Sequence, residues 1–180
     1  MKPLFTVAIL LPLAVTTACK KDDARAGAAE AKAAEPAAPP AKLTWARLGG
    51  LGLEAQVPDG TTVDDNTAGA GFPAATLWTS PTTFVMGAGE LSPLQPDLAA
   101  AKGEIQKDPN PFKRFTKEEP TEGGWRLEYE LESMIDQTPL YGVQIRTTID
   151  GQPWECGSNT SSPAERAQVI SICASLRKAS

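Results

Sequence analysis

The sequence predicts an α+β domain in which an antiparallel sheet of about six strands packs against two main helices. Three patterns predict it. Apolar and polar residues alternate along several segments, as is typical of strands with one buried face and one solvated face. Turn residues rich in glycine separate pairs of these segments and indicate hairpins. Two other segments carry apolar residues at helical spacing, next to residues that start or stop helices.

Six segments are predicted as strands. In chain order they are residues 51–57, 82–88, 112–118, 125–132, 141–149 and 153–157. Residues 82–88 are more continuously apolar, which indicates a central strand, whereas most of the others alternate. Glu122-Gly123-Gly124 indicates a hairpin between the third and fourth segments, and Asp150-Gly151 indicates one between the fifth and sixth.

Two helices are predicted. The first covers about residues 96–107 and stops before Pro109. One face of it carries Leu98, Ala101 and Ile105. The second begins at Ser162, because Ser162-Pro163-Ala164-Glu165 is a capping box with proline in the first turn. Its apolar stripe is Val169, Ile170, Cys173 and Leu176, and it ends in Arg177 and Lys178, whose charge suits a helix C-terminus.

The order of these elements supports a resemblance. Trp45-Ala46-Arg47-Leu48 opens the region, and Leu53 and Val57-Pro58-Asp59-Gly60 follow. With a middle helix, a strand meander and a closing helix, this order resembles the PsbP/Mog1-like αβα sandwich, a fold that several bacterial lipoprotein families are thought to share. The resemblance covers most of residues 43–180 and implies one domain. It implies no single activity, because one fold hosts many functions.

Residues 1–18 are predicted to be a signal peptide. Lys2 gives a positive start, and residues 4–18 are an apolar run, broken by Pro12, that is too short for a membrane-spanning helix. Cys19 follows Thr16-Thr17-Ala18 directly, which resembles the lipobox of bacterial lipoproteins, although that family prefers leucine where Thr16 stands. The resemblance implies cleavage before Cys19 and acylation of its thiol, for example with palmitate, and of its new amino group. The alternative is an ordinary secretory signal with an unmodified cysteine.

Residues 19–42 are predicted to be the lipidated cysteine and a disordered tether. The segment is rich in alanine and proline and has no aromatic or β-branched residue with which to build a core. Acyl chains on Cys19 would make the lipid bilayer the first partner, because two or three chains anchor a protein stably. Lys20 follows the cysteine, which by the same resemblance favours the outer membrane in a host with two membranes.

The cysteine count predicts a disulfide. The chain has three cysteines, so lipidation of Cys19 leaves Cys156, on the last predicted strand, and Cys173, on the last helix. An exported protein encounters oxidising conditions, which favour a structural bond between them. A redox-active pair is the weaker alternative, because the spacing is far from Cys-x-x-Cys.

Composition excludes several functions. The chain has no histidine, which excludes Ser-His-Asp and Cys-His nucleophiles and histidine-ligated zinc. Its 17 basic and 22 acidic residues give a net charge of −5, which argues against a nucleic-acid partner. Its glycine-rich segments lack the setting of a dinucleotide fingerprint, so no cofactor is predicted.

The remaining candidates favour a non-catalytic binding or structural domain with an envelope protein or glycan as partner. Trp78 is the candidate ligand-binding residue, since Trp125, Tyr129 and Tyr141 fall on inward positions. Asp59, Asp64 and Asp65 are a weak candidate for a cation-binding loop, although no metal site is predicted. The alternative function is a carboxylate-based hydrolase of the cell envelope, whose candidates are Glu118, Glu119, Glu128, Glu130 and Glu132.

Overall fold

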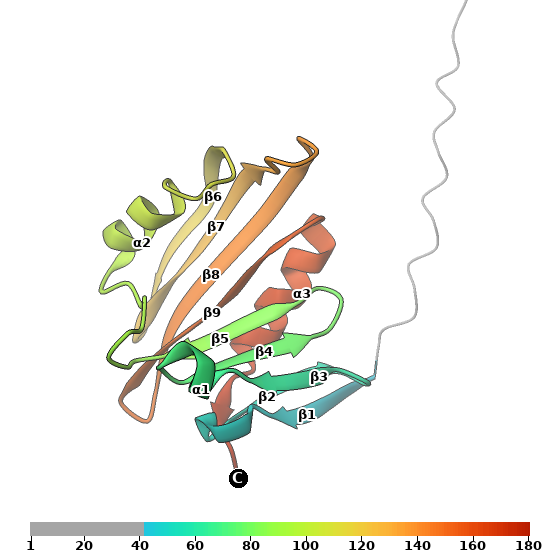
Figure 1. Cartoon of the computed structure of the whole chain (residues 1–180), viewed down its shortest axis with the longest axis vertical. Coiled ribbons are helices and arrows are strands. Elements are labelled where there is room, and N and C mark those ends of the chain that lie inside the picture. The colour runs from blue at the N-terminus through green and yellow to red at the C-terminus, as the bar shows by residue number, and fades with distance from the viewer. Residues whose placement is uncertain (1–41) are drawn as a thin grey trace, which may run out of the picture. The chain divides into compact units, whose positions relative to one another are not determined.

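The computed structural model describes residues 42–180 (Figure 1). The predicted signal peptide, Cys19 and all but the last residue of the predicted tether lie outside the described residues. Within residues 42–180, no helix is long and apolar enough to cross a membrane.

Seven strands form one antiparallel sheet in the order β3-β4-β5-β9-β8-β7-β6. These strands are β3 (Thr62–Asp65), β4 (Ala74–Trp78), β5 (Thr83–Gly87), β6 (Phe112–Thr121), β7 (Gly124–Glu132), β8 (Pro139–Ile149) and β9 (Gln152–Thr160). A smaller antiparallel sheet has the order β1-β2-β10. Its strands are β1 (Leu43–Arg47), β2 (Leu53–Pro58) and β10 (Arg177–Lys178).

The α-helices are short. They are α1 (Thr67–Ala70), α2 (Leu98–Ile105) and α3 (Pro163–Ala174), and a 3₁₀ turn, Gly49–Leu51, joins β1 to β2. Asp97 caps α2 by accepting a hydrogen bond from the backbone of Ala100. Ser162 caps α3 by accepting one from the backbone of Glu165, as the capping box predicts.

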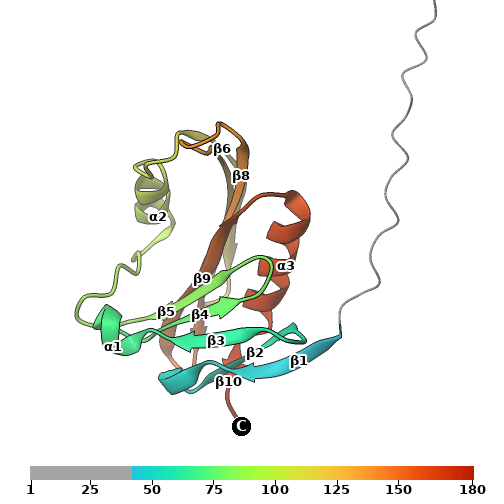
Figure 2. The ribbon, with the colours of Figure 1, turned by 45° about the vertical axis from the view of Figure 1, so that its right-hand side comes forward.

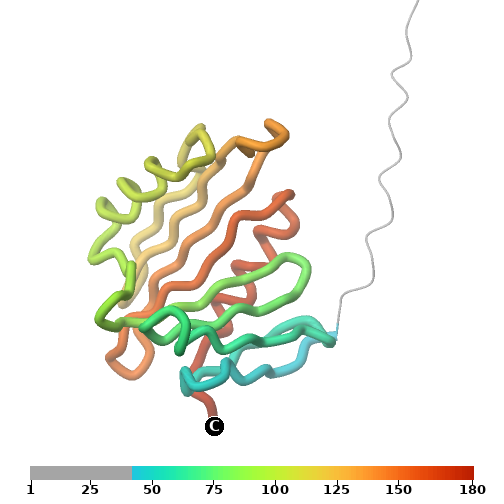
Figure 3. Tube along the Cα trace, viewed as in Figure 1, coloured from blue at the N-terminus to red at the C-terminus, as the bar shows by residue number. Residues whose placement is uncertain are grey.

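The α2 and α3 helices lie on opposite sides of the large sheet (Figures 1 and 2). On one side, Ala101 and Ile105 of α2 pack with the inward residues of β7, which are Trp125, Leu127, Tyr129 and Leu131. On the other side, Val169 and Ile172 of α3 pack in the main core with residues of β2, β4, β5, β8 and β9. The trace in Figure 3 shows the small sheet beneath β3 and β4 at the end of the domain where α3 terminates.

The expected α+β sandwich, with about six strands packed against two main helices, was wrong. Strands predominate in the described residues, with ten of them in two sheets, and the three α-helices have only 4, 8 and 12 residues. The prediction missed β1, β3, β4 and β10, which are short or lie at sheet edges. Arg177 and Lys178 do not end the last helix, because they pair with Glu54 and Leu53 of β2.

The predicted disulfide is confirmed. Cys156 of β9 and Cys173 of α3 are bonded, and their Cα atoms lie 5.6 Å apart. Cys173 shares the buried face of α3 with Val169 and Ile172, and Ile170 packs at its margin. The bond therefore joins the closing helix to a central strand of the large sheet.

Candidate ligand-binding groove

One face of the large sheet is only partly covered. α2 packs on this face against β7, and the neighbouring surface over β5, β9 and β8, with Trp78 of β4 at its edge, is a groove of about 580 Å³. Figure 2 shows α2 standing beside the sheet at one end of this face. The residues that define the groove include Trp78, Phe84, Met86, Glu104, Asp108, Tyr129, Gln144, Glu155, Gly157 and Asn159.

The sheet register determines the floor of the groove. Phe84 pairs with Gly157, and Gly157 pairs with Gln144. Paired residues of antiparallel strands point to the same face, so these three lie in one row across β5, β9 and β8. A Cβ on Gly157 would lie 2.2 Å from the carbonyl oxygen of Val143, so this position requires glycine. The floor is therefore hollow between Phe84 and Gln144.

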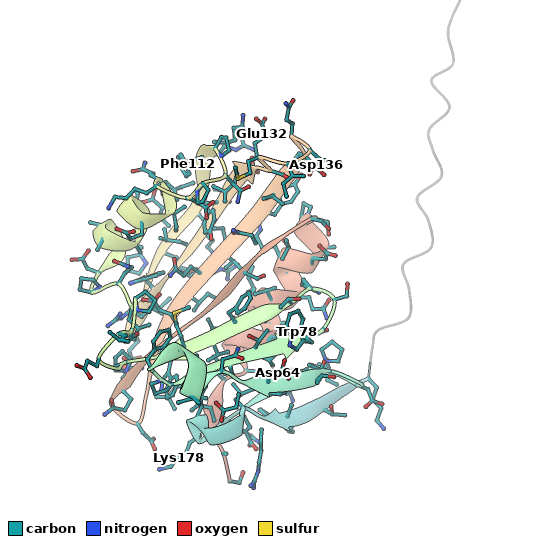
Figure 4. The ribbon with its side chains drawn as sticks, in the orientation of Figure 1. Asp64, Trp78, Phe112, Glu132, Asp136 and Lys178 are labelled. Carbon is teal, nitrogen blue, oxygen red and sulfur yellow. A yellow bond between two sulfur atoms is a disulfide. The ribbon has the colours of Figure 1, made fainter. Side chains whose placement is uncertain are left out.

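Exposed apolar side chains form one wall. Trp78 at the end of β4 is 53% exposed, and Phe84 on β5 is 47% exposed. The indole Nε1 of Trp78 donates a hydrogen bond of 2.5 Å to Oδ2 of Asp64, and Figure 4 shows the two residues at neighbouring strand positions. The structure thus places the predicted Trp78 in the groove. The sequence interpretation missed Phe84 and Met86, because a continuously apolar strand suggested burial on both faces.

A buried carboxylate lies in the next row of the floor. Glu155 pairs with Met86 on β5 and with Arg146 on β8, and only 1% of it is exposed. Its Oε1 accepts a hydrogen bond of 2.7 Å from the backbone of Gln95, and its Oε2 accepts one of 2.6 Å from Nε2 of Gln144. Nη1 of Arg146 lies 3.4 Å from Oε1. Burial raises the pKa of Glu155, and these hydrogen bonds and Arg146 oppose the rise.

Glu155 and Arg146 together hold the segment that leads into α2. We call residues 88–97, between β5 and α2, the strap. Glu155 accepts from the backbone N–H of Gln95, and Arg146 donates to the backbone carbonyl of the same residue. Both polar groups of this strap residue are therefore fixed to the sheet, which places the start of α2.

The opposite wall is acidic. Glu104 comes from the last turn of α2, and Asp108 follows that helix. Glu104 forms an ion pair of 2.7 Å with Lys107, three residues along the chain, and both side chains are largely exposed. Oδ1 of Asp108 accepts hydrogen bonds from the backbone and the side chain of Asn110. The carboxylate of Asp108 is thus held in place by neutral donors.

Tyr129 closes the floor at the boundary with α2. It pairs with Gly142 of β8, and a Cβ on Gly142 would lie 2.0 Å from Cε2 of the tyrosine ring. The ring therefore rests on the bare backbone of Gly142, an arrangement by which an aromatic residue covers a cross-strand glycine. Burial raises the pKa of the Tyr129 phenol, so this side chain stays neutral.

Gly142→Ala should destabilise the domain by about 1–3 kcal/mol, because the new methyl group must displace the Tyr129 ring. Gly103→Ala is the matched control. Gly103 lies inside α2 with open space around its missing Cβ, so alanine should stabilise by about 0.5–1 kcal/mol. Urea unfolding of both variants should show a lower free energy of unfolding for Gly142→Ala and a higher one for Gly103→Ala. A Gly142→Ala variant as stable as the wild type would show that the ring does not rest on Gly142.

The candidate cation ligands Asp59, Asp64 and Asp65 are not brought together. Asp64 and Asp65 are consecutive residues of β3, so their side chains point to opposite faces. Asp65 accepts from the backbone of Thr67 and of Gly50, and its hydrogen bonds with these two residues lower its pKa. Within residues 42–180, no group of three or more cysteine, aspartate or glutamate side chains is arranged to hold a metal ion.

The carboxylates proposed for a hydrolase lie on both faces of the sheet. Glu118 pairs with Leu127 and lies on the α2 face, where Lys102 binds it at 2.7 Å. Glu128 lies on the opposite face and is bound by Arg126 and Arg166. The other three are also ion-paired: Glu119 with Lys117, Glu130 with Arg114 and Glu132 with Lys113. Glu118 is thus separated by the sheet from the other four, which share one face and are each bound by a cation. A glycosidase pair needs two carboxylates about 5–10 Å apart across a cleft.

Comparison with known proteins identifies no relative. No protein-family model matches the sequence, no curated protein is significantly similar to it, and no solved structure gives a significant match. Function must therefore be inferred from the chemistry of the groove and from the N-terminal sequence.

Proposed function

We propose that this protein is a lipoprotein of the bacterial cell envelope, anchored through an acylated Cys19, whose folded domain binds a ligand in the groove and catalyses no reaction. The groove carries the proposal. Its volume of about 580 Å³ lies within the range of about 300–1,000 Å³ that is typical of small-molecule sites. Trp78 and Phe84 expose aromatic surface toward it, and exposed apolar surface of this kind marks binding sites.

The chemistry of the groove favours binding over catalysis. Its buried carboxylate, Glu155, is engaged by Arg146, Gln144 and the strap. The chain has no histidine that could act as a base. The groove therefore offers recognition groups, whereas its buried ionisable group serves the fold.

Two features support export and anchoring. Cys19 directly follows an apolar segment that ends in small residues, and the alanine- and proline-rich residues up to 42 suit a spacer. The Cys156–Cys173 bond supports an oxidising compartment, because disulfides are rare in the cytosol. We place the anchor in the outer membrane where the host has two membranes, since Lys20 follows the cysteine.

Photocrosslinking of the full-length protein in its own envelope tests both parts of the proposal. A benzophenone amino acid replaces Phe84 in the groove or, as the matched control, Ile135, which is 92% exposed in the loop between β7 and β8. We expect a covalent adduct at position 84 that is absent at position 135 and is lost in Trp78→Ala. Equal labelling at the two positions, or none at position 84, would contradict binding in the groove.

Mass spectrometry of the same preparation tests the anchor. The mature chain should begin at Cys19 and carry the mass of two or three acyl chains. Cys19→Ser should leave an uncleaved precursor without acyl chains, whereas Cys156→Ser with Cys173→Ser should keep them. An unmodified Cys19, a mature chain that begins elsewhere, or recovery of the protein in the cytosol would remove the lipoprotein assignment.

A further inference from the structure

We infer that the ligand of the groove is an organic cation, a small molecule that carries ammonium groups on an alkyl chain. This inference rests on the proposed binding function and specifies its ligand class. Three independent properties of the groove support it: the charge of its walls, the state of its aromatic rings and its apolar floor.

The charge of the walls selects a cation. Glu104, Asp108 and Glu155 line the groove, Asp64 lies beside Trp78, and no lysine or arginine of the described residues is part of the lining. Glu104 and Glu155 have cationic partners, but Asp64 and Asp108 form no ion pair within residues 42–180. The whole chain also carries a net charge of −5. A cleft lined by one sign of charge concentrates ligands of the opposite sign.

The aromatic rings of the groove are open to a cation. Elsewhere in the domain, rings are covered by the chain's own cations: Arg177 lies 3.4 Å from the Trp45 ring centre, Lys102 4.9 Å from that of Phe115 and Arg166 5.8 Å from that of Tyr141. Within the described residues, no such cation covers Trp78 or Phe84, although both are about half exposed. A cation over the face of tryptophan or phenylalanine is attracted by the ring quadrupole.

Asp64 orients the Trp78 ring for contact with a cation. Its Oδ2 accepts the hydrogen bond of 2.5 Å from the indole nitrogen, so the polar edge of the ring is satisfied and its orientation is fixed. The same carboxylate adds a negative charge beside the ring, which strengthens the attraction for a cation at short range. Trp78 and Asp64 therefore act as one recognition unit at the edge of the sheet.

The floor accepts the apolar part of the ligand. Met86 and Ile105 contribute apolar surface on two sides, and Gly157 leaves room between them. Methionine adapts its shape to different apolar partners because it is unbranched. An alkyl chain lying across the floor would bring terminal ammonium groups toward the aromatic wall with Asp64 and toward the acidic wall with Asp108.

Calorimetric titration of the full-length protein in neutral detergent tests the inference with two matched probes. 1,6-Diaminohexane carries two ammonium groups at neutral pH, whereas 1,6-hexanediol has the same chain and no charge. We expect the diamine to bind and the diol to bind at least tenfold more weakly. Raising the salt concentration should weaken diamine binding, because screening reduces attraction between exposed charges.

Three variants test whether the diamine binds in the groove. Trp78→Leu keeps an apolar side chain and removes the aromatic face, so diamine affinity should fall by about 2-fold to about 30-fold. Asp108→Asn with Glu104→Gln removes charge from the opposite wall and should weaken the diamine without affecting the diol. Trp45→Phe is the control, because Trp45 lies in the small sheet under Arg177 and should leave affinity unchanged.

The outcomes separate this inference from the proposed function. If the diol binds as tightly as the diamine and Trp78→Leu abolishes both, the groove binds ligands but does not select cations, and the inference is overturned. If neither probe binds while the adduct at position 84 forms, the inference is also overturned and the proposed function stands. If neither probe binds and no adduct forms, both the inference and the proposed binding in the groove are overturned, whereas the lipid anchor is decided by the mass spectrum.

Discussion

Glu155→Ala should lower the free energy of unfolding by about 3–5 kcal/mol, the loss that is typical when one partner of a buried ion pair is removed. Arg146 would keep its charge in a site where only 18% of its side chain is exposed. The backbone N–H of Gln95 would lose its acceptor as well. Urea unfolding measures the loss, and hydrogen exchange should show that the strap opens before the core of the large sheet.

The physical cause can be isolated with a double variant. Arg146→Met with Glu155→Leu removes both charges and leaves no ion buried without a partner. Replacing a buried pair by apolar residues is often neutral, whereas removing one member is costly. The double variant should therefore be more stable than Glu155→Ala. If it is equally unstable, the loss comes from the hydrogen bonds to Gln95 and Gln144 and not from the stranded charge.

The pH dependence of stability gives a second readout for Glu155. Burial raises its pKa above the ordinary value of 4.5, so the folded state holds this proton more tightly than the unfolded state. The group contributes stability that is fully present below pH 4.5 and is lost as pH rises through the raised pKa. Glu130 behaves oppositely, because its hydrogen bond with Arg114 lowers its pKa. Glu130 and other such groups contribute equally to the wild type and to Glu155→Gln, so the difference in the free energy of unfolding between the two isolates Glu155. As pH rises, Glu155→Gln should become more stable relative to the wild type.

The strands that were predicted most clearly are those with one apolar, buried face and one polar face. β7 and β8 alternate along most of their length, because one side of β7 packs under α2 and the other is charged. β10 has only two residues, and long-range contacts hold it in place. Arg177 binds Glu54 at 2.7 Å and lies over Trp45, on the neighbouring strands of the small sheet. No local pattern in Arg177-Lys178 indicates these partners, so the positive pair suggested a helix end instead.

The candidate site was predictable only in part, for a similar reason. Trp78 stood out because Trp125, Tyr129 and Tyr141 fall on inward positions of predicted strands, and the structure places Trp78 in the groove. Phe84 and Met86 are spaced two apart on β5 and therefore share a face, but period-2 spacing does not indicate whether that face is covered. The exposure of this face of β5 depends on where α2 lies. That position depends in turn on the contacts of Gln95 with Glu155 and Arg146, two strand residues far away in the sequence.

Removal of the Cys156–Cys173 bond should cost about 3 kcal/mol, which the chain-entropy model gives for a loop of this length. The two cysteines are 17 residues apart, so the bond restricts a short loop of the unfolded chain. For a domain of this size the loss corresponds to a fall in melting temperature of roughly 10 °C. Dithiothreitol reduction of the wild type and the variant Cys156→Ala with Cys173→Ala should give similar urea midpoints. Unchanged midpoints in both would show that the bond adds no net stability.

The effect should be local, because the two ends of the bond are held unequally. β9 is paired with β5 and β8 along its length, so Cys156 keeps its position without the bond. Cys173 lies near the end of α3, where Val169 and Ile172 supply the remaining apolar contacts, whereas the first turn is held separately by Arg166, which binds Glu128. Hydrogen exchange after reduction should therefore increase first in the last turns of α3, while β9 stays protected and diamine affinity stays the same. If β9 and α3 lose protection together, the disulfide stabilises the floor of the groove as well as the helix.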